Sequence, residues 1–231
     1  MGLKYRNEYK AVLDGARLGL IEKALRGLCI PDSHAGEDGR YKVKSLYFDT
    51  PDRRCYLQTL DGVDDRAKYR IRIYDNSPDF ISLERKESLR GKKRKLTQRI
   101  SRRVFDSIVN GDSINEEGEV LNRFLADAEA FRLEGIAVIE YDRTSFTHPA
   151  GNVRVTFDRN ISAYRGDLFS VNPSAVPVMF NDMHVLEVKF DEVLPGAIKS
   201  CLDAYGIEVS SFSKYVHGID ALSGIMEGDY R

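Results

Sequence analysis

The residues of this sequence with the clearest chemical meaning are polar and charged side chains that stand two positions apart. Residues two apart in a β-strand point to the same face of the sheet, so each set predicts a strand with one charged face. The sets, in chain order, are Arg6, Glu8 and Lys10; Arg70 and Arg72; Glu84 and Lys86; Lys93 and Lys95; Tyr141 and Arg143; and Glu187 and Lys189, with Arg154 and Lys214 as single cations.

This set is rich in the groups that bind phosphate. Arginine presents a planar fork of donors that matches phosphate oxygens, and lysine adds a mobile positive charge. Counted together without Lys93, which lies at the predicted turn, ten cations outnumber the three glutamates by seven charges. If the charged faces converge on one another, they form a binding site for a polyanion.

Two arrangements of these strands compete. Charged alternation most often marks the water-exposed face of an antiparallel sheet, and for any single pair this is the better interpretation. The positions between the charges are mostly apolar, however, and need a cover of their own. Helices at 15–28, 101–131 and 195–224 can cover them from outside, which leaves the charged faces to line an interior. Because buried charge is costly, that interior must hold water, metal or a charged ligand.

Turn residues and periodicity predict the elements that position these side chains. Helices are expected at 15–28, 101–110 and 119–131, after Pro195, and over the final segment from 211 to 224, while 163–182 is expected to cross the surface. The fold class is therefore α+β, an antiparallel β-tunnel with peripheral helices, in a single domain of residues 1–231. Strands are predicted at 3–13, 40–49, 66–75, 79–87, 92–100, 133–147, 152–162 and 184–191.

Overall composition limits the partners and the compartment. The net charge is −1, so the molecule exerts no long-range attraction on nucleic acid, and the basic run 90–95 is short and lies at a predicted turn. The three cysteines are widely spaced, without a zinc or disulfide pattern. No apolar run reaches the length of a membrane span, and the first residues lack a signal peptide. We expect a cytoplasmic protein that binds no nucleic acid.

Several segments together resemble a known family. RNEYK near the start, YRIR, LERK, GKKRK, EYDRTSF, VRVTFDRNI, VLEVKF and SFSKY follow one another in the order and spacing of the polyphosphate polymerase domain of the vacuolar transporter chaperone (VTC) family. The resemblance spans nearly the whole chain. It implies the triphosphate tunnel metalloenzyme (CYTH-like) fold, in which eight antiparallel strands close into a tunnel.

The resemblance also implies roles for individual residues. Arg70, Arg72, Arg143, Arg154 and Lys86 are expected to act on the transferred phosphoryl group; Lys10, Lys93, Lys95, Lys189 and Lys214 to bind phosphate; and Glu187, Glu8 and Glu84 to hold a metal ion. Of these, Glu187 matches the metal-binding glutamate of the family. Arg94 is an alternative to Lys93 or Lys95, because a one-residue shift in register reverses the face that each occupies.

The function implied is an ATP-dependent phosphotransferase that adds the γ-phosphate to a growing polyphosphate chain, assisted by Mn²⁺ or Mg²⁺. Pyrophosphate or a short polyphosphate would serve as primer, and a membrane protein partner stays open. Arg6 stands where hydrolases of this fold carry the first glutamate of E-x-E-x-K, which favours a polymerase, whereas Ser211 replaces a lysine of the fungal enzymes. Two alternatives remain: a triphosphatase or polyphosphatase of the same fold, and a non-catalytic module that binds polyphosphate or inositol phosphates.

Overall fold

The computed structural model of the chain describes residues 6–32, 39–89, 92–171, 174–180 and 182–224. Its centre is an antiparallel sheet of ten strands, eight of which follow the order β1-β10-β8-β7-β3-β4-β5-β6. Two short strands, β2 and β9, pair with β7 and β8. The strands are β1 (Asn7–Asp14), β2 (Ile30–Pro31), β3 (Arg40–Asp49), β4 (Arg66–Tyr74), β5 (Ile81–Leu89), β6 (Lys92–Ile100), β7 (Glu134–His148), β8 (Val153–Tyr164), β9 (Val176–Pro177) and β10 (Met183–Phe190).

The eight strands predicted from the sequence correspond to the eight strands of this path, which confirms an antiparallel α+β fold. The boundaries differ by at most four residues, and positions 3–5 of the first predicted strand lie outside the described residues. Two of these strands form a hairpin, since β7 and β8 pair and are joined by a short 3-10 turn, η1 (Ala150–Asn152). Alternation of residue type was sufficient to locate these strands, because one face of each strand is mostly charged and the other is mostly apolar.

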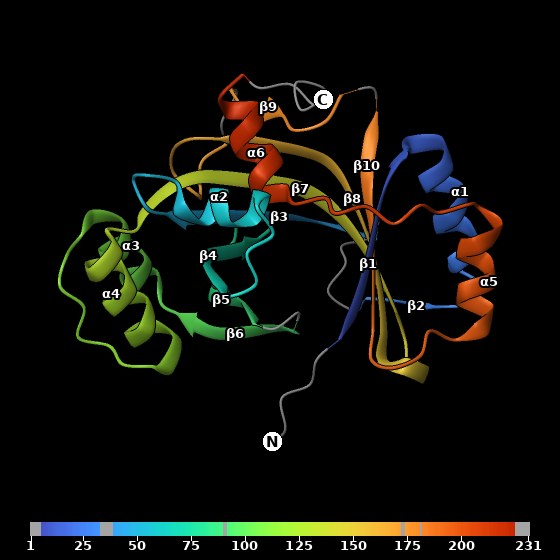
Figure 1. The fold of residues 1–231 in the computed structure, drawn as a ribbon, viewed down its shortest axis with the longest axis horizontal. Coiled ribbons are helices and arrows are strands. Elements are labelled where there is room, and N and C mark those ends of the chain that lie inside the picture. The colour runs from blue at the N-terminus through green and yellow to red at the C-terminus, as the bar shows by residue number, and fades with distance from the viewer. Residues whose placement is uncertain (1–5, 33–38, 90–91, 172–173, 181, 225–231) are drawn as a thin grey trace.

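The sheet is curled into a half-barrel, with β1 and β6 as its edge strands (Figure 1). Lys93 of β6 and Lys86 of β5 lie 3.5 and 3.8 Å from the Glu8 carboxylate of β1. Backbone pairing in the described part of the chain does not link β1 to β6. Ion pairs, instead of a continuous hydrogen-bond ladder, therefore connect the two edges.

Four helices cover the outer, apolar face of the sheet as two separate cores. Helices α3 (Arg102–Asn110) and α4 (Glu119–Phe131) pack on β3, β4 and β5, where Ile71 and Leu83 meet Leu121 and Phe124. Helices α1 (Gly15–Leu25) and α5 (Gly196–Ala204) pack on β1, β8 and β10. Figure 1 shows these helix pairs at opposite ends of the curved sheet. None of the helices in the described ranges is long and apolar enough to cross a membrane.

The last helix corrects one expectation. The sequence analysis placed the whole segment 195–224 on the outside, but α6 (Lys214–Leu222) packs on the inner face of the sheet, beside α2 (Arg54–Leu60). Val216 and Ile219 of α6 share a buried cluster with Ile139 of β7, whose side chain points inward. A Cβ on Gly218 would lie 2.2 Å from the Ile139 side chain, so this close approach requires glycine. The inner face is thus apolar under α6 and charged beyond it.

Candidate functional site

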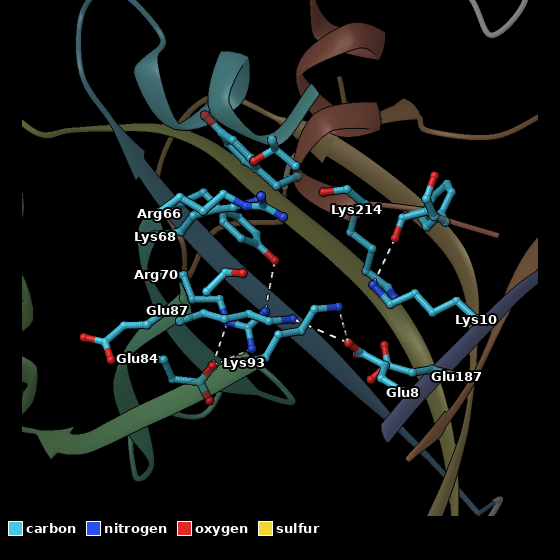
Figure 2. A pocket seen from close by; sticks show the side chains of 18 of the residues that line it. Glu8, Lys10, Arg66, Lys68, Arg70, Glu84, Glu87, Lys93, Glu187 and Lys214 are labelled. Atoms are coloured by element: carbon cyan, nitrogen blue, oxygen red, sulfur yellow. Dashed lines mark hydrogen bonds and ion pairs between the residues drawn. The ribbon is translucent and has the colours of Figure 1, made fainter. Parts of the chain in front are cut away.

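The inner face of the sheet borders a cavity of about 470 Å³. Side chains from β1, β4, β5, β6, β7 and β10 and from the start of α6 line it, and their charged ends converge from several sides (Figure 2). Ten lysines and arginines face four glutamates in this lining, an excess of six positive charges. The cavity is therefore suited to a multivalent anion.

Eleven of the thirteen site residues predicted from the sequence line this cavity. The other two are nearby: Lys95 bonds to Glu84, and Arg154 bonds to Asp32 at 2.7 Å and to the Tyr41 hydroxyl at 3.3 Å. Arg94, the alternative to its neighbouring lysines, pairs with Glu87 at 3.8 Å. The eleven are Glu8, Lys10, Arg70, Arg72, Glu84, Lys86, Lys93, Arg143, Glu187, Lys189 and Lys214.

One side of the cavity consists of four cations that alternate along β4, which we call the β4 wall: Arg66, Lys68, Arg70 and Arg72. Arg72 is 7% exposed, and its guanidinium donates to the Ser45 hydroxyl at 3.1 Å and the Tyr141 hydroxyl at 3.2 Å. Both partners are neutral and, among the described residues, no carboxylate pairs with Arg72. The Arg72 guanidinium is consequently held in one orientation, and no described carboxylate neutralises its positive charge.

Arg70 is the member of the β4 wall that has an acidic partner. Its Nε donates to the Glu84 carboxylate at 2.6 Å, and its Nη1 donates to the Tyr47 hydroxyl at 3.1 Å. Burial alone would raise the pKa of Glu84, but Arg70, Arg72 and Lys95 outweigh it and hold that pKa well below its usual value. Arg70 and Arg72 likewise outweigh burial at Tyr47 and lower its pKa.

The opposite side of the cavity contains a buried ion-pair group, the Asp158 cluster: Arg143, Asp158 and Lys214. Asp158 is fully buried on β8 and accepts two hydrogen bonds from Arg143, at 2.6 and 2.8 Å. The Lys214 ammonium, from the first residue of α6, lies 2.7 Å from the same carboxylate. Burial would raise the pKa of Asp158, but these two cations lower it to about 2.

Two further carboxylates, Glu8 and Glu187, face the cavity from neighbouring strands. In the β1–β10 register, Glu8 lies opposite Lys189 and Lys10 lies opposite Glu187. Lys189 contacts both carboxylates. Burial opposes ionisation of Glu187, yet Lys189, Lys10 and Lys214 hold its pKa well below the ordinary value. Both groups are therefore anionic near neutral pH.

These carboxylates bear on the expected Mn²⁺ or Mg²⁺. Such ions are bound through one or two carboxylates together with water and substrate phosphates, so a pair of glutamates suffices only when phosphate supplies the remaining oxygens. Glu8 and Glu187 face the cavity together, and to hold such an ion with phosphate they would give up their contacts with Lys189. Glu84 would likewise have to give up its hydrogen bonds from Arg70 and Lys95. The described residues contain no group of three or more side chains that could hold a metal without such help.

Lysines crowd the cavity where β4 begins and β5 ends. Lys68, Lys86 and Lys95 occupy one row across β4, β5 and β6, each directly opposite the next. The Lys86 side chain is 45% exposed, but it faces the cavity and is enclosed by the curled sheet. Burial, together with repulsion from Lys10 and Lys189, lowers its pKa to about 7 in spite of Glu8. Burial and Arg66 lower the pKa of Lys68 to about 8.

Several residues that line the cavity or lie directly behind its lining were not predicted from the sequence. Lys68 continues the alternation of Arg70 and Arg72 by one step, and Asp158 continues that of Arg154, so extending the period-two pattern would have found both. Tyr47 was not among the predicted site residues, but it lines the cavity and its hydroxyl accepts a hydrogen bond from Arg70. Thr59, Leu60 and Gly62 also line the cavity, but they belong to no period-two pattern. They lie at or just after the end of α2, a helix that the sequence did not predict.

A curled antiparallel sheet that surrounds a cation-lined cavity defines a class of anion-binding tunnel-like proteins. Residues 5–223 match the model of the VTC domain family, and the chain belongs to this family. A search of curated proteins found no match. Among solved structures, a candidate adenylate cyclase from Bacillus halodurans is similar over 92% of this chain and 96% of its own, with a TM-score of 0.57 and 15% identity.

Proteins of Pyrococcus horikoshii OT3 also resemble the chain. The similarity to the PH1012 protein covers 89% of this chain and 94% of that protein. The similarity to the PH1819 protein covers 93% of this chain and 98% of that protein. Both have a TM-score of 0.47 and 12% identity. The similarity to the Bacillus protein, at its low identity, is a similarity of fold. The function must therefore be argued from the cavity of this chain.

Proposed function

We propose that this protein is a nucleotide-dependent polyphosphate polymerase, which transfers the γ-phosphate of ATP to a growing polyphosphate chain inside the cavity. The observation that carries the proposal is the excess of six positive charges in a lining where phosphate-matching arginines are buried and held in place. Membership of the VTC domain family supports the same substrate class. In this proposal the half-barrel acts as a tunnel through which linked phosphates lie end to end.

The reaction would proceed as an in-line displacement. A terminal phosphate oxygen of the chain attacks the γ-phosphorus and forms a new P–O bond, while the bond from the γ-phosphorus to the β,γ-bridging oxygen breaks. ADP leaves with that electron pair. Because the attacking oxygen is already anionic, no side chain is needed to deprotonate it. The protein contributes alignment and stabilisation of the charge on the transferred group.

The residues of the cavity divide this work according to their partners. Arg72 and Arg70 are the best-placed groups for the transferred phosphoryl oxygens, since neutral hydroxyls orient them and only Arg70 shares a carboxylate. Lys86, on the neighbouring strand β5 and paired with Lys68 of the β4 wall, adds mobile positive charge. The Tyr47 and Tyr141 hydroxyls accept from the arginines, which leaves their own hydrogens free to donate to phosphate.

The remaining predicted cations hold the flanking phosphates in this proposal. Lys10 and Lys189 lie beside Glu8 and Glu187, the carboxylates that would hold Mn²⁺ or Mg²⁺ together with phosphate oxygens. When bound, the ion would neutralise charge that develops on the phosphoryl oxygens. The start of α6 lines the cavity beside Lys214, and the N-terminal end of a helix favours anions.

Incubation of the purified protein with ATP and Mn²⁺ tests the proposal. A polymerase produces ADP and long phosphate chains that are resolved on a polyacrylamide gel. Release of orthophosphate without chains would instead identify a triphosphatase of the same fold. Tight binding of polyphosphate without any turnover would identify a binding module. Either of these last two results would overturn the polymerase assignment.

A further inference from the structure

The beginning of β4 contains positive charge that the reaction proposed above does not use. Lys68 lies directly opposite Lys86 in the β4–β5 register, and Lys86 lies opposite Lys95 in the β5–β6 register. Like charges placed directly opposite each other destabilise a sheet. Repulsion within this row of three lysines therefore destabilises the folded sheet, and a nearby anion would reduce that repulsion.

Lys68 differs from the other two lysines of this row in its ion pairing. Lys86 and Lys95 each have a glutamate within ion-pair distance, Glu8 at 3.8 Å and Glu84 at 3.0 Å. In the part of the chain that the structure describes, neither Lys68 nor its strand neighbour Arg66 forms an ion pair with an acidic side chain. Lys68 instead lies over the ring of Tyr215, 5.3 Å from the ring centre.

The carboxylate whose charge acts on Lys68 is that of Asp49, and it already accepts several hydrogen bonds. Asp49, at the end of β3, accepts hydrogen bonds from the backbone of Cys55 at 2.7 Å and of Tyr56 at 3.0 Å. It also accepts a hydrogen bond from the hydroxyl of Tyr215. These donors fix Asp49 to the start of α2, so its charge acts on Lys68 from a distance and the two form no ion pair.

Position then determines what the unpaired charge could bind. Arg66 and Lys68 precede Arg70 on β4 and lie on its α2 side (Figure 2). Thr59 and Leu60, the last residues of α2, also line the cavity. At about 3.4 Å per residue, the β4 wall from Arg66 to Arg72 is about 20 Å long. A triphosphate, which has only two bridging oxygens, covers less than half of that length. Cations at the α2 end are in excess of what ATP requires.

We propose that Lys68 and Arg66 form an additional phosphate subsite at the α2 end of the cavity, which binds phosphoryl groups of a linear polyphosphate beyond the three held near Arg70 and Arg72. This inference rests on the proposed function, because it concerns the same bound chain. It gives that chain a direction: the part of the polymer beyond a triphosphate's length lies along the start of β4 and below α2. Phosphate chains longer than three are then bound more tightly than tripolyphosphate.

Calorimetric binding of two probes, inorganic tripolyphosphate and a linear polyphosphate several times longer, tests the subsite. Lys68→Met is expected to weaken binding of the long chain about tenfold, the effect of losing one charged contact, and to change tripolyphosphate binding little. Lys68→Arg should retain the preference for the long chain. Lys23→Met, on the exposed face of α1, is the matched control and should bind both probes like the wild type.

Misfolding is not expected to obscure this result, because Lys68 is only partly buried and forms no ion pair with the described residues, so Lys68→Met should leave the protein about as stable as before. Equal losses for both probes would place Lys68 in the triphosphate site and overturn the inference, as would unchanged binding of both. The outcome is separate from the polymerase test. Loss of long-chain preference in Lys68→Met supports the subsite even if ATP yields no polymer, and polymer synthesis with an indifferent Lys68 removes only the subsite.

Discussion

The two sides of the cavity contain similar side chains but differ in how their charges are compensated. In the Asp158 cluster, one buried carboxylate holds Arg143 and Lys214 at hydrogen-bond distance. In the β4 wall, four cations share the single carboxylate of Glu84, which also bonds to Lys95. Cations neutralised within the protein contribute to structure, and cations left without an acid remain available to a ligand.

This difference separates residues that sequence patterns treat alike. Arg72 and Arg143 both stand on inward faces and both match the cations expected from the family. Only Arg143 has a carboxylate partner, whereas Arg72 is oriented by the hydroxyls of Ser45 and Tyr141. We therefore expect stability to depend mainly on the Asp158 cluster and anion binding mainly on the β4 wall. Substitutions on each side can test this division.

The largest effect on stability is expected for Asp158→Ala. Without the carboxylate, Arg143 and Lys214 remain buried without their acidic partner, which costs about 3–5 kcal/mol of unfolding free energy. Chemical denaturation measures this loss. Thr156→Ala, on the same strand and face, is the matched control and should cost much less, because its buried hydroxyl has no partner in the described structure. If Asp158→Ala does not fold, Asp158→Asn provides the milder variant; wild-type stability in Asp158→Asn would contradict the structural role.

The largest effect on turnover is expected for Arg72→Ala. Loss of a preorganised donor to the transferred group typically lowers kcat by about 10²–10³. Because Arg72 is a buried charge without an acidic partner, its removal should leave stability nearly unchanged. Steady-state kinetics of ATP consumption and thermal denaturation together check both expectations. Wild-type turnover in Arg72→Ala would show that the β4 wall does not act on the reacting phosphate.

Much of this arrangement could be predicted from the sequence. Strands such as β4 alternate charged and apolar residues so regularly that their existence follows from the period, and the inward direction of the charged face follows from the apolar face that helices must cover. Eleven of thirteen predicted site residues lie in the cavity for the same reason. What a strand pattern cannot give is which strands become neighbours. The pairing of Lys68 with Lys86, or of Arg143 with Asp158, depends on register between strands and is visible only in the assembled sheet.

Helices at the cavity were harder to predict than strands. The helix α2 is seven residues long and lacks buried residues, so it has no apolar periodicity to detect. The segment of α6 was correctly predicted as helical, but its apolar face fits the inner side of a curved sheet as well as the outer side. The pattern of a helix shows that its apolar side must be buried. It does not show which side of the sheet the helix packs on.

A substitution at Glu84 should sharpen the comparison by making the β4 wall still more positive. Glu84→Gln releases Arg70 and Lys95 from their ion pairs, so affinity for tripolyphosphate should rise by about threefold to tenfold, with a steeper dependence on salt. Unfolding free energy should fall, since Arg70 is left without an acidic partner. Glu129→Gln on the exposed part of α4 is the control. Weaker binding in Glu84→Gln would mean that Glu84 itself contributes to the ligand site, as a metal ligand would.

The smallest expected effect is a pH dependence that originates from Lys68. Burial, followed by Arg66, lowers its pKa from 10.5 to about 8 in the folded protein. Above pH 8 the unfolded chain therefore holds more protons at this site than the folded chain, and unfolding free energy should rise with pH up to about 10.5. The groups that face Lys68 are Arg66 of β4, Lys10 of β1, Asp49 of β3, Cys55 near the start of α2, Lys86 of β5 and Tyr215 of α6.

Binding of phosphate should show the opposite slope. A phosphate beside Lys68 favours the charged ammonium and raises its pKa again, so binding takes up a proton and affinity for long polyphosphate should fall as the pH rises above 8. The difference between wild type and Lys68→Met, measured by denaturation and by calorimetry across this range, isolates the contribution of this lysine from that of Lys86. Parallel curves for the two proteins in both experiments would mean that Lys68 neither titrates in this range nor contacts the anion, and the β4 wall would then end at Arg70.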